Sequence, residues 1–252
     1  MKQILCDTKV QQCAKFIEEA KSISVLTGAG ISTSAGIPDF RGPNGLYVTR
    51  RYDPEAVFDI GFFHRDPKPF YEFARDFVNL EQTIQPTVAH KFLAALENSG
   101  KLKGIVTQNI DALHHKAGSK NVYEMHGSIW QSYCLECDKK FSYEKMKELL
   151  KKPEVPQCGC GGIIKPDVVF FGENVKYFNE ASRLAEDSDL FFVIGSSCVV
   201  YPAAMIPTLA SGKIVIVNKG EIGLSSDNIA LTVEDDIDAF FALLSKELKM
   251  KI

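Results

Sequence analysis

The sequence predicts a doubly wound α/β fold, in which a parallel sheet carries a second, smaller domain. Short, wholly apolar runs of strand length alternate with amphipathic helical stretches. This alternation is typical of a parallel sheet covered by helices on both faces. Polar or Gly-rich clusters follow several of the runs, at the strand ends where such sheets bind ligands. Two long stretches interrupt the alternation.

Length and composition are compatible with this fold and exclude several other classes. The chain has 252 residues, of which 45% are hydrophobic, and a formal net charge of −3. It therefore has enough apolar residues for a sizeable core and shows no basic footprint for nucleic acid. No apolar run reaches the ~18 residues of a membrane span, and the N-terminus lacks a signal-type apolar segment. Seven cysteines, an odd number, argue against a disulfide framework. We expect a soluble, cytoplasmic protein with no membrane or nucleic-acid partner.

The first helix is expected to begin at Thr8, a good N-cap residue. Its apolar face consists of residues at helical spacing: Val10, Cys13, Ala14 and Ile17. Cys6 and Cys13 are interpreted as small buried residues.

Further strands and helices follow in order. Apolar β-type runs predict strands at 24–27, 104–107, 190–194 and 213–217. Helices are expected at 87–99, 177–185, 203–209 and 236–248. Thr87 would cap the first of these and Gly100 would end it, whereas Pro207 must sit at a kink or an end.

The two interrupting stretches are interpreted as insertions. Residues 36–66 are rich in Gly, Pro and aromatic residues without a clean period, and residues 127–166 carry four cysteines. We expect residues 1–35, 80–126 and 167–252 to form the Rossmann-like domain of the parallel sheet. The small domain would then comprise residues 36–79 and 127–166, a helical, loop-rich insertion with a cysteine ribbon.

The four cysteines form two close pairs, Cys134-x-x-Cys137 and Cys158-x-Cys160, separated by 20 residues. Four thiolates in two pairs suit a tetrahedral zinc ion, and the separation leaves room for a three-stranded ribbon. The second pair is one residue shorter than the usual spacing. Zinc held by four cysteines has no open coordination position, so it would hold the fold and activate no water.

A Gly-rich loop, 28–30, follows the first strand. The third glycine of a dinucleotide fingerprint would stand at position 33, which is Thr33, and no ribose-binding acid follows about 20 residues later. An ordinary dehydrogenase is therefore disfavoured, and a simple turn is the alternative. Backbone amides and hydroxyls after the loop suit phosphates, and Arg41 adds charge. Phe40 is placed to shield a ligand from water.

His126 is the first candidate for chemistry. It stands at a strand end, before Gly127 and beside the second insertion. An unperturbed pKa of about 6.5 suits a general base. A structural role is the alternative, and it is our interpretation of the other four histidines: His64, His90, His114 and His115.

These motifs together resemble the sirtuin family. The run GAGISTSAGIPDFRG at 28–42 is similar to its signature, and the other segments follow in the family's order: TQNID at 107–111, EMHG at 124–127, VFFGE at 169–173, GSS at 195–197 and VN at 217–218. The resemblance extends from about Ala20 to Leu244.

The resemblance implies an enzyme that consumes NAD to remove acyl groups, by default acetyl, from lysine side chains of other proteins. In this mechanism the acyl oxygen attacks C1′ of the nicotinamide ribose and nicotinamide leaves. His126 then deprotonates a ribose hydroxyl, and the products are lysine and O-acyl-ADP-ribose. The cofactor supplies the hard step.

The resemblance also implies roles for individual residues. His126, Asn109 and Asp111 would be catalytic, with Asn109 holding the ribose or a water and Asp111 the carboxamide. Asp111 as a helix N-cap is the alternative. Gln108 would contact the ribose. The NAD site would further include Gly28, Ala29, Thr33, Phe40, Arg41 and Ile110 on the nicotinamide side, and Gly195, Ser196, Ser197, Asn218, Lys219, Asp236 and Ile237 on the adenosine side. Turn chemistry is the alternative for most of these residues, and an N-cap for Asp236.

Two segments resemble those that bind the substrate peptide as an added strand. The residues concerned are Val168, Phe171, Gly172, Glu173, Val199 and Tyr201. An ordinary core strand is the alternative for residues 168–170, and Cys198 is interpreted as a packing residue. The family branch that removes acidic acyl groups carries a Tyr-x-x-Arg pair. Here Tyr71 is followed by Ala74, with Arg75 one residue out of register, so a neutral acyl group is favoured.

Two rival functions remain open at this point. An ADP-ribosyltransferase would use the same NAD site and pass the ribose to a partner protein. A non-catalytic NAD-sensing interaction module would need only the sheet and the zinc ribbon. The presence of Gln108, Asn109, Asp111 and His126 together favours deacylation.

Overall fold

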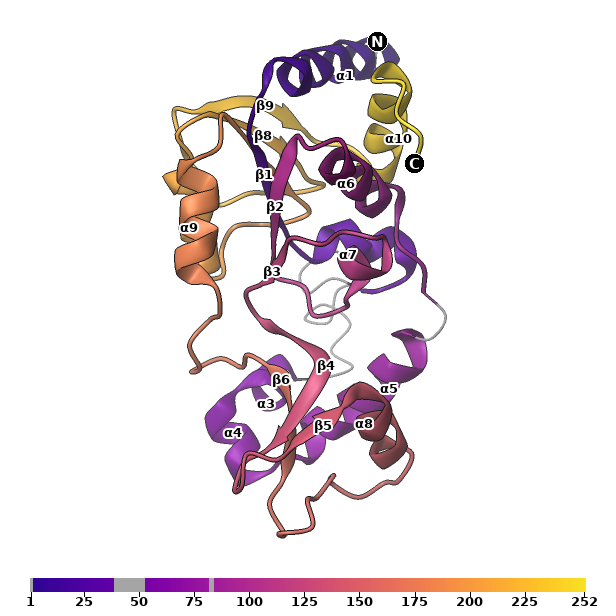
Figure 1. Ribbon diagram of the computed structural model, residues 1–252, viewed down its shortest axis with the longest axis vertical. Helices are drawn as coiled ribbons and strands as arrows, with labels where there is room; N and C mark the ends of the chain where they lie inside the picture. Colours follow the sequence, from indigo (N-terminus) through magenta and orange to yellow (C-terminus); the bar gives the residue numbers. More distant parts are fainter. Residues whose placement is uncertain (1, 39–52, 82–83) are drawn as a thin grey trace.

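The computed structural model describes residues 2–38, 53–81 and 84–252. A six-stranded, wholly parallel sheet forms its larger domain (Figure 1), with the strand order β3-β2-β1-β7-β8-β9. The strands are β1 (Ile23–Thr27), β2 (Leu102–Thr107), β3 (Val122–Glu124), β7 (Leu190–Ile194), β8 (Lys213–Val217) and β9 (Ile229–Val233). The chain builds outward from β1 in one direction and from β7 in the other. The crevice between β1 and β7 is therefore the topological switch point, where doubly wound sheets bind ligands.

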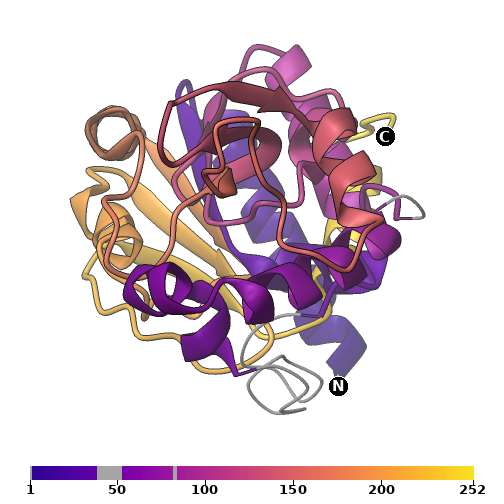
Figure 2. The same cartoon turned by 90° about the horizontal axis from the view of Figure 1, so that it is seen from below.

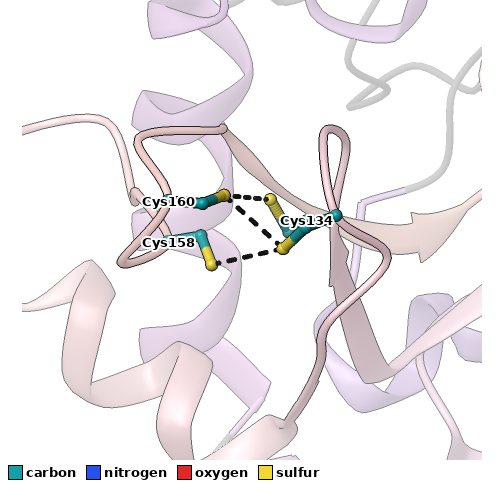
Figure 3. Close-up of side chains that lie close together, drawn as sticks. Cys134, Cys158 and Cys160 are labelled. Atoms are coloured by element: carbon teal, nitrogen blue, oxygen red, sulfur yellow. Dashed lines mark hydrogen bonds between the residues drawn. The ribbon is translucent and has the colours of Figure 1, made fainter.

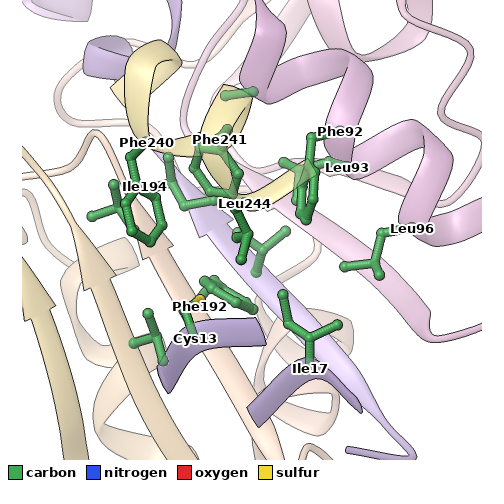
Figure 4. Close-up of a cluster of buried hydrophobic side chains, with 14 of the residues drawn as sticks. Cys13, Ile17, Phe92, Leu93, Leu96, Phe192, Ile194, Phe240, Phe241 and Leu244 are labelled. Carbon is green, nitrogen blue, oxygen red and sulfur yellow. The ribbon is translucent and has the colours of Figure 1, made fainter. Parts of the chain in front are cut away.

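Helices cover both faces of this sheet because successive strand residues point to opposite sides. Val25 faces a core shared with α1 (Lys2–Glu19), α6 (Val88–Asn98) and α10 (Ile237–Glu247). Figure 4 shows Ile17, Phe92 and Phe241 of these three helices meeting over the strands. Leu26 faces the opposite core, which α9 (Phe178–Glu186) and the 3₁₀ helix η2 (Ala203–Leu209) complete. The predicted fold class is thereby confirmed.

The smaller domain contains a three-stranded antiparallel sheet of order β5-β4-β6. Its elements are α3 (Pro54–Phe58), α4 (Ile60–Arg65), α5 (Lys68–Glu81), β4 (Gly127–Cys134), β5 (Lys140–Ser142), α8 (Tyr143–Leu150) and β6 (Ile164–Val168). Seen from below, the purple helices at 54–81 lie on one side of the small domain, and the red segments at 127–150 lie largely on the other (Figure 2). Phe63 packs edge to face with Phe70 and with Phe170, and these rings share one core with Ile129 and Met146 of the second stretch.

Most of the predicted elements are found, and the differences have physical reasons. Thr8 lies inside α1, so the prediction that it caps the helix is wrong. Residues 2–7 contain no Gly or Pro, and nothing in them ends a helix. Thr87 and Asp236 cap α6 and α10 through their side-chain oxygens, as the sequence patterns indicate. Pro207 lies within η2, whose 3₁₀ geometry accommodates it. No helix among the described residues has the length and apolarity that crossing a membrane requires.

Candidate active site

The register of the parallel strands brings the candidate residues together. Thr27 of β1 pairs with Thr107 of β2 and with Ile194 of β7, and Ile194 pairs with Val217 of β8. The strands end level with one another, so the residues that follow them emerge side by side at one edge of the sheet. Those residues are Gly28, Gln108, Gly195 and Asn218.

Two glycine loops meet at the switch point. Gly30 N–H donates to the carbonyl of Gly195 (2.9 Å). A Cβ at Gly28 would lie 2.8 Å from the Gly195 oxygen, and one at Gly30 would lie 2.7 Å from the Gly195 Cα. Gly195 itself has φ +62°. Glycine is therefore needed at positions 28, 30 and 195 for this close contact between the two loops.

A hydrogen-bonded group lies at the end of β2. Asn109 Nδ2 donates to the Gly28 carbonyl and to Ser32 Oγ, each at 3.2 Å. Ser32 lies on the 3₁₀ helix η1 (Ala29–Ala35) and donates to Asp111 Oδ2 at 2.7 Å. Asp111 Oδ1 accepts from the N–H of Leu113 (2.9 Å), the first residue of α7 (Leu113–Lys116). Burial raises the pKa of Asp111, and these hydrogen bonds oppose the rise.

Two side chains join the halves of the sheet across the switch point. Gln108, after β2, donates from its amide nitrogen to Ser196 Oγ, after β7, at 2.8 Å. Behind them, the hydroxyl of Thr27 lies 2.9 Å from Thr107 Oγ1 and 2.9 Å from Nε2 of the fully buried His114. His90 is also buried, and its Nδ1 atom lies 2.8 Å from the hydroxyl of Thr87. The buried positions of His90 and His114 agree with the structural roles predicted for them.

His126 follows β3 and reaches the same edge. Its Nδ1 atom lies 2.9 Å from the carbonyl oxygen of Gln108. A carbonyl only accepts, so Nδ1 carries the proton and Nε2 keeps its lone pair. Burial lowers the pKa of His126, partly offset by this hydrogen bond. The imidazole is therefore neutral at neutral pH and presents a basic nitrogen.

The other NAD-site candidates lie around this edge. Ser196 and Asn218 are nearly buried, whereas Thr33, Lys219 and Asp236 are exposed. The carboxylate of Asp236 accepts a hydrogen bond from the N–H of Ala239 (3.0 Å). Asp236 is therefore an N-cap residue, which was the structural alternative to a role in NAD binding. Ala29 lies in η1, Ser197 follows Ser196, and Ile237 is the first residue of α10. Phe40 and Arg41 lie outside the described residues.

The candidate peptide-binding residues differ in accessibility. Three of them present large exposed side chains: Phe171, Val199 and Tyr201. Val168 is buried within β6 and pairs with Gly127, which matches the core-strand alternative. Gly172 is exposed with φ +94°, and Glu173 turns its carboxylate inward to Lys165 (2.9 Å). Cys198 is buried, and burial raises the pKa of its thiol.

An apolar cavity of about 30 Å³ borders the site from the small domain. Ile110, which lies between Asn109 and Asp111, lines it together with Val168 and Ala74. Tyr71 is fully buried and donates its hydroxyl to the carbonyl of Ile164 (2.5 Å). Arg75 points elsewhere, to the carbonyls of Lys152, Pro153 and Glu154.

The sulfur atoms of Cys134, Cys137, Cys158 and Cys160 all lie within 4.8 Å of one another. Figure 3 shows the side chains of Cys134, Cys158 and Cys160 pointing toward one another. Three measured separations are 3.4 Å for Cys134–Cys160, 3.8 Å for Cys137–Cys158 and 3.5 Å for Cys137–Cys160. Sulfur ligands about 2.3 Å from a tetrahedral zinc ion would be about 3.8 Å apart. A Cβ at Gly162 would lie 2.7 Å from Cys134 Sγ, so only glycine leaves room for the sulfur. The cluster fits zinc.

Reasoning from the sequence did not single out Ser32 or Lys165. Ser32 lies in the Gly-rich run, but a serine there is indistinguishable from its neighbours Thr33 and Ser34 until the fold brings Asp111 to it. Lys165 is nearly fully buried, and a lysine between apolar residues carried no signal that its partner was Glu173.

Comparisons with known proteins agree with this geometry. Residues 28–202 match the Sir2 family. An NAD-dependent protein deacetylase of Thermotoga maritima is 45% identical over 219 residues, covering 84% of this chain and 88% of that protein. One of Saccharolobus solfataricus is 44% identical over 246 residues, covering 94% and 98%.

Solved structures give the same result. A Sir2 structure with a deacetylated p53 peptide and 3′-O-acetyl ADP ribose superposes with a TM-score of 0.89 at 41% identity, covering 96% of this chain and all of that one. A Sir2 bound to an acetylated peptide gives 0.85 at 39% identity, covering 95% and 98%.

Proposed function

Because this chain belongs to the Sir2 family of sirtuins, we propose that it is an NAD-dependent protein-lysine deacetylase that acts at the switch-point edge of the sheet. The observation that carries the proposal is the position of His126. Its neutral imidazole is held by Gln108, next to the Asn109–Ser32–Asp111 group. An acetylated lysine of another protein is the substrate, and the products are the free lysine, nicotinamide and O-acetyl-ADP-ribose.

The residues at the switch point fit NAD. Amide and hydroxyl groups of Gln108, Asn109 and Ser196 line the edge, where a dinucleotide can take hydrogen bonds from both halves of the sheet. The glycine loops bring the backbone close to a diphosphate. Asn109 and Asp111 would hold the nicotinamide end, and Asn218 and Lys219 the adenosine end. When bound, NAD supplies a cationic glycosidic bond whose cleavage drives removal of the acyl group.

His126 is assigned the role of general base. With Nδ1 protonated and bonded to the Gln108 carbonyl, Nε2 is the atom that takes a proton from a ribose hydroxyl. Asn109 orients the ribose or a water, and Asp111 orients the carboxamide. The buried bonds of Asp111 to Ser32 and Leu113 hold its carboxylate in one orientation before the substrate arrives.

The acyl group is expected to be small and neutral. The cavity beside Ile110 and Val168 is lined by apolar side chains. One of them is Ala74, which occupies the position of the arginine in the Tyr-x-x-Arg pair and carries no positive charge. A carboxylate in such a place would be buried unpaired, which is costly. A cavity of about 30 Å³ has room only for a small group, on the scale of one or two water molecules. Acetyl is therefore the best fit.

The small domain has the structural metal site. Cys134, Cys137, Cys158 and Cys160 supply four sulfur ligands for zinc, whose coordination is then closed. Zinc would hold β4 to the loop that leads into β6, and β6 in turn leads into the peptide-binding segment. No step of the reaction requires this ion.

The test is an assay with NAD and an acetyl-lysine peptide that measures nicotinamide and deacetylated peptide together. The wild type should release both in equal amounts. His126→Ala should release no deacetylated peptide and at most one nicotinamide per active site, because its block falls after nicotinamide has left, and it should keep its melting temperature. Nicotinamide release without deacetylation would instead support an ADP-ribosyltransferase. Absence of turnover on acetyl, longer acyl and protein substrates would support an NAD-sensing interaction module.

A further inference from the structure

Lys165 has an unusual environment for a lysine. It lies in β6 of the small domain, and its side chain is 1% exposed. Its ammonium donates to the carbonyl of Val168 (2.7 Å) and to Glu173 Oε2 (2.9 Å), and it lies 4.2 Å from the centre of the Phe170 ring. The two hydrogen bonds and the ring face account for its three N–H groups. A lysine is almost never buried so completely without such partners.

All of these partners belong to the segment 168–173. Glu173 Oε2 also accepts from the N–H of Phe170 (2.7 Å), and Glu173 N–H donates to the Phe170 carbonyl (3.0 Å). Phe170 to Glu173 thus form a tight turn, with Gly172 at φ +94°. Lys165 ties this turn to the strand before it, because its side chain bonds both to Val168, the last residue of β6, and to Glu173, the last residue of the turn.

The same segment is tied to the catalytic histidine. Val169 N–H donates to the carbonyl of His126 at 2.8 Å, and Val168 pairs with Gly127. The residue Phe171, in the same segment, is 48% exposed at the surface. A shift of the turn would therefore displace the surface assigned to the peptide and would reach the backbone of His126.

We propose that Lys165 is a positioning residue for the acylated peptide: through Glu173 and Val168 it holds the segment 168–173 in the shape that binds the substrate. This inference rests on the proposed function. It also gives Glu173 an inward role, in place of a direct contact with the peptide. The positive charge is required because two oxygen acceptors, the carbonyl of Val168 and the carboxylate of Glu173, converge on a buried point.

A second ion pair, between residues that flank this segment, provides a matched control. Lys176 lies 2.5 Å from Asp167, but the two side chains are 33% and 34% exposed. Solvent-exposed ion pairs contribute little, whereas removing one partner of a buried pair leaves a charge without compensation. If ion pairing alone mattered, the two lysines would behave alike.

The experiment compares Lys165→Met, Glu173→Gln, the double variant and Lys176→Met, with KM measured separately for acetyl-lysine peptide and for NAD. Lys165→Met should raise the peptide KM on the order of tenfold, with the NAD KM and the zinc content unchanged. Lys176→Met should change either KM by less than about twofold. In the double variant the two effects should not multiply, since both residues act through one contact.

Three results would overturn the positioning role: an unchanged peptide KM in Lys165→Met, an equal rise in both KM values, or multiplying effects in the double variant. If Lys165→Met does not fold, Glu173→Gln becomes the variant that tests the positioning role. The Glu173 side chain is 26% exposed, and a glutamine at this position can still accept the hydrogen bond from the N–H of Phe170. An unchanged peptide KM there overturns the inference. A wild type that turns over no peptide overturns the proposed function as well, and this is seen before any variant is compared.

Discussion

The imidazole Nδ1 of His126 lies 2.9 Å from the carbonyl oxygen of Gln108. Gln108 follows β2 and His126 follows β3, and these strands pair with Thr107 opposite Glu124. The register of two adjacent strands thus sets the tautomer of the proposed base. Residues 18 positions apart in the chain meet because both emerge at the same edge of the sheet.

The pH dependence of deacetylation follows from this contact. The base must be neutral, and burial lowers the pKa of His126 from its ordinary value of about 6.5. Activity should therefore be retained at neutral pH and be lost only as pH falls through that lowered pKa, on the acid side of the ordinary histidine value. The pH profile of kcat/KM for NAD at saturating peptide measures it. An acid limb centred above pH 7 would contradict the assignment of His126 as the base.

Ser32→Ala should weaken NAD use, because Asp111 loses the donor at 2.7 Å and Asn109 loses an acceptor. Deleting one hydrogen bond to a buried charge typically costs about 1.5–3 kcal/mol. We expect kcat/KM for NAD to fall by on the order of tenfold or more. Ser34→Ala is the control, since Ser34 is exposed on the same short helix. Equal behaviour of the two variants would show that the Ser32–Asp111 bond has no functional role.

Loss of one zinc ligand should act on the fold and only indirectly on the chemistry. Cys137→Ser is expected to abolish stoichiometric zinc in elemental analysis and to lower the melting temperature, because the cluster joins segments at 134–137 and 158–160. Activity should fall in parallel with folded protein. Cys13→Ala, which removes a buried thiol from the large domain, should keep its zinc. Full zinc content in Cys137→Ser would contradict the assigned ligand set.

Ala74→Val tests the acyl preference. The added carbons should fill the cavity of about 30 Å³ that Ala74 lines. We expect kcat/KM for propionyl- and butyryl-lysine peptides to fall on the order of tenfold relative to acetyl, with acetyl turnover nearly unchanged. Ala95→Val, on helix α6 of the large domain, is the control. A uniform loss for all three acyl groups would mean that the cavity does not receive the acyl chain.

Local patterns were sufficient for much of this protein. The apolar runs at 190–194 and 213–217 form strands as predicted, and the amphipathic stretches form helices. Thr87 and Asp236 cap helices because capping depends on residues only three positions apart. Cysteine spacing predicted a four-sulfur cluster, since each pair lies within one turn of chain. Strand β9 was missed, and β3 was expected only as a strand ending before His126, without bounds, because short, half-buried runs carry little periodicity.

By itself the sequence determined the fold class, the order of the candidate motifs and the types of residue available for NAD, zinc and peptide. Tertiary structure alone decided which side chains meet. It placed Ser32 on Asp111, Gln108 on Ser196 and Lys165 on Glu173. It also turned the carboxylate of Glu173 inward. These pairings depend on strand order and register, which are set by packing across the whole sheet and leave no short-range pattern along the chain.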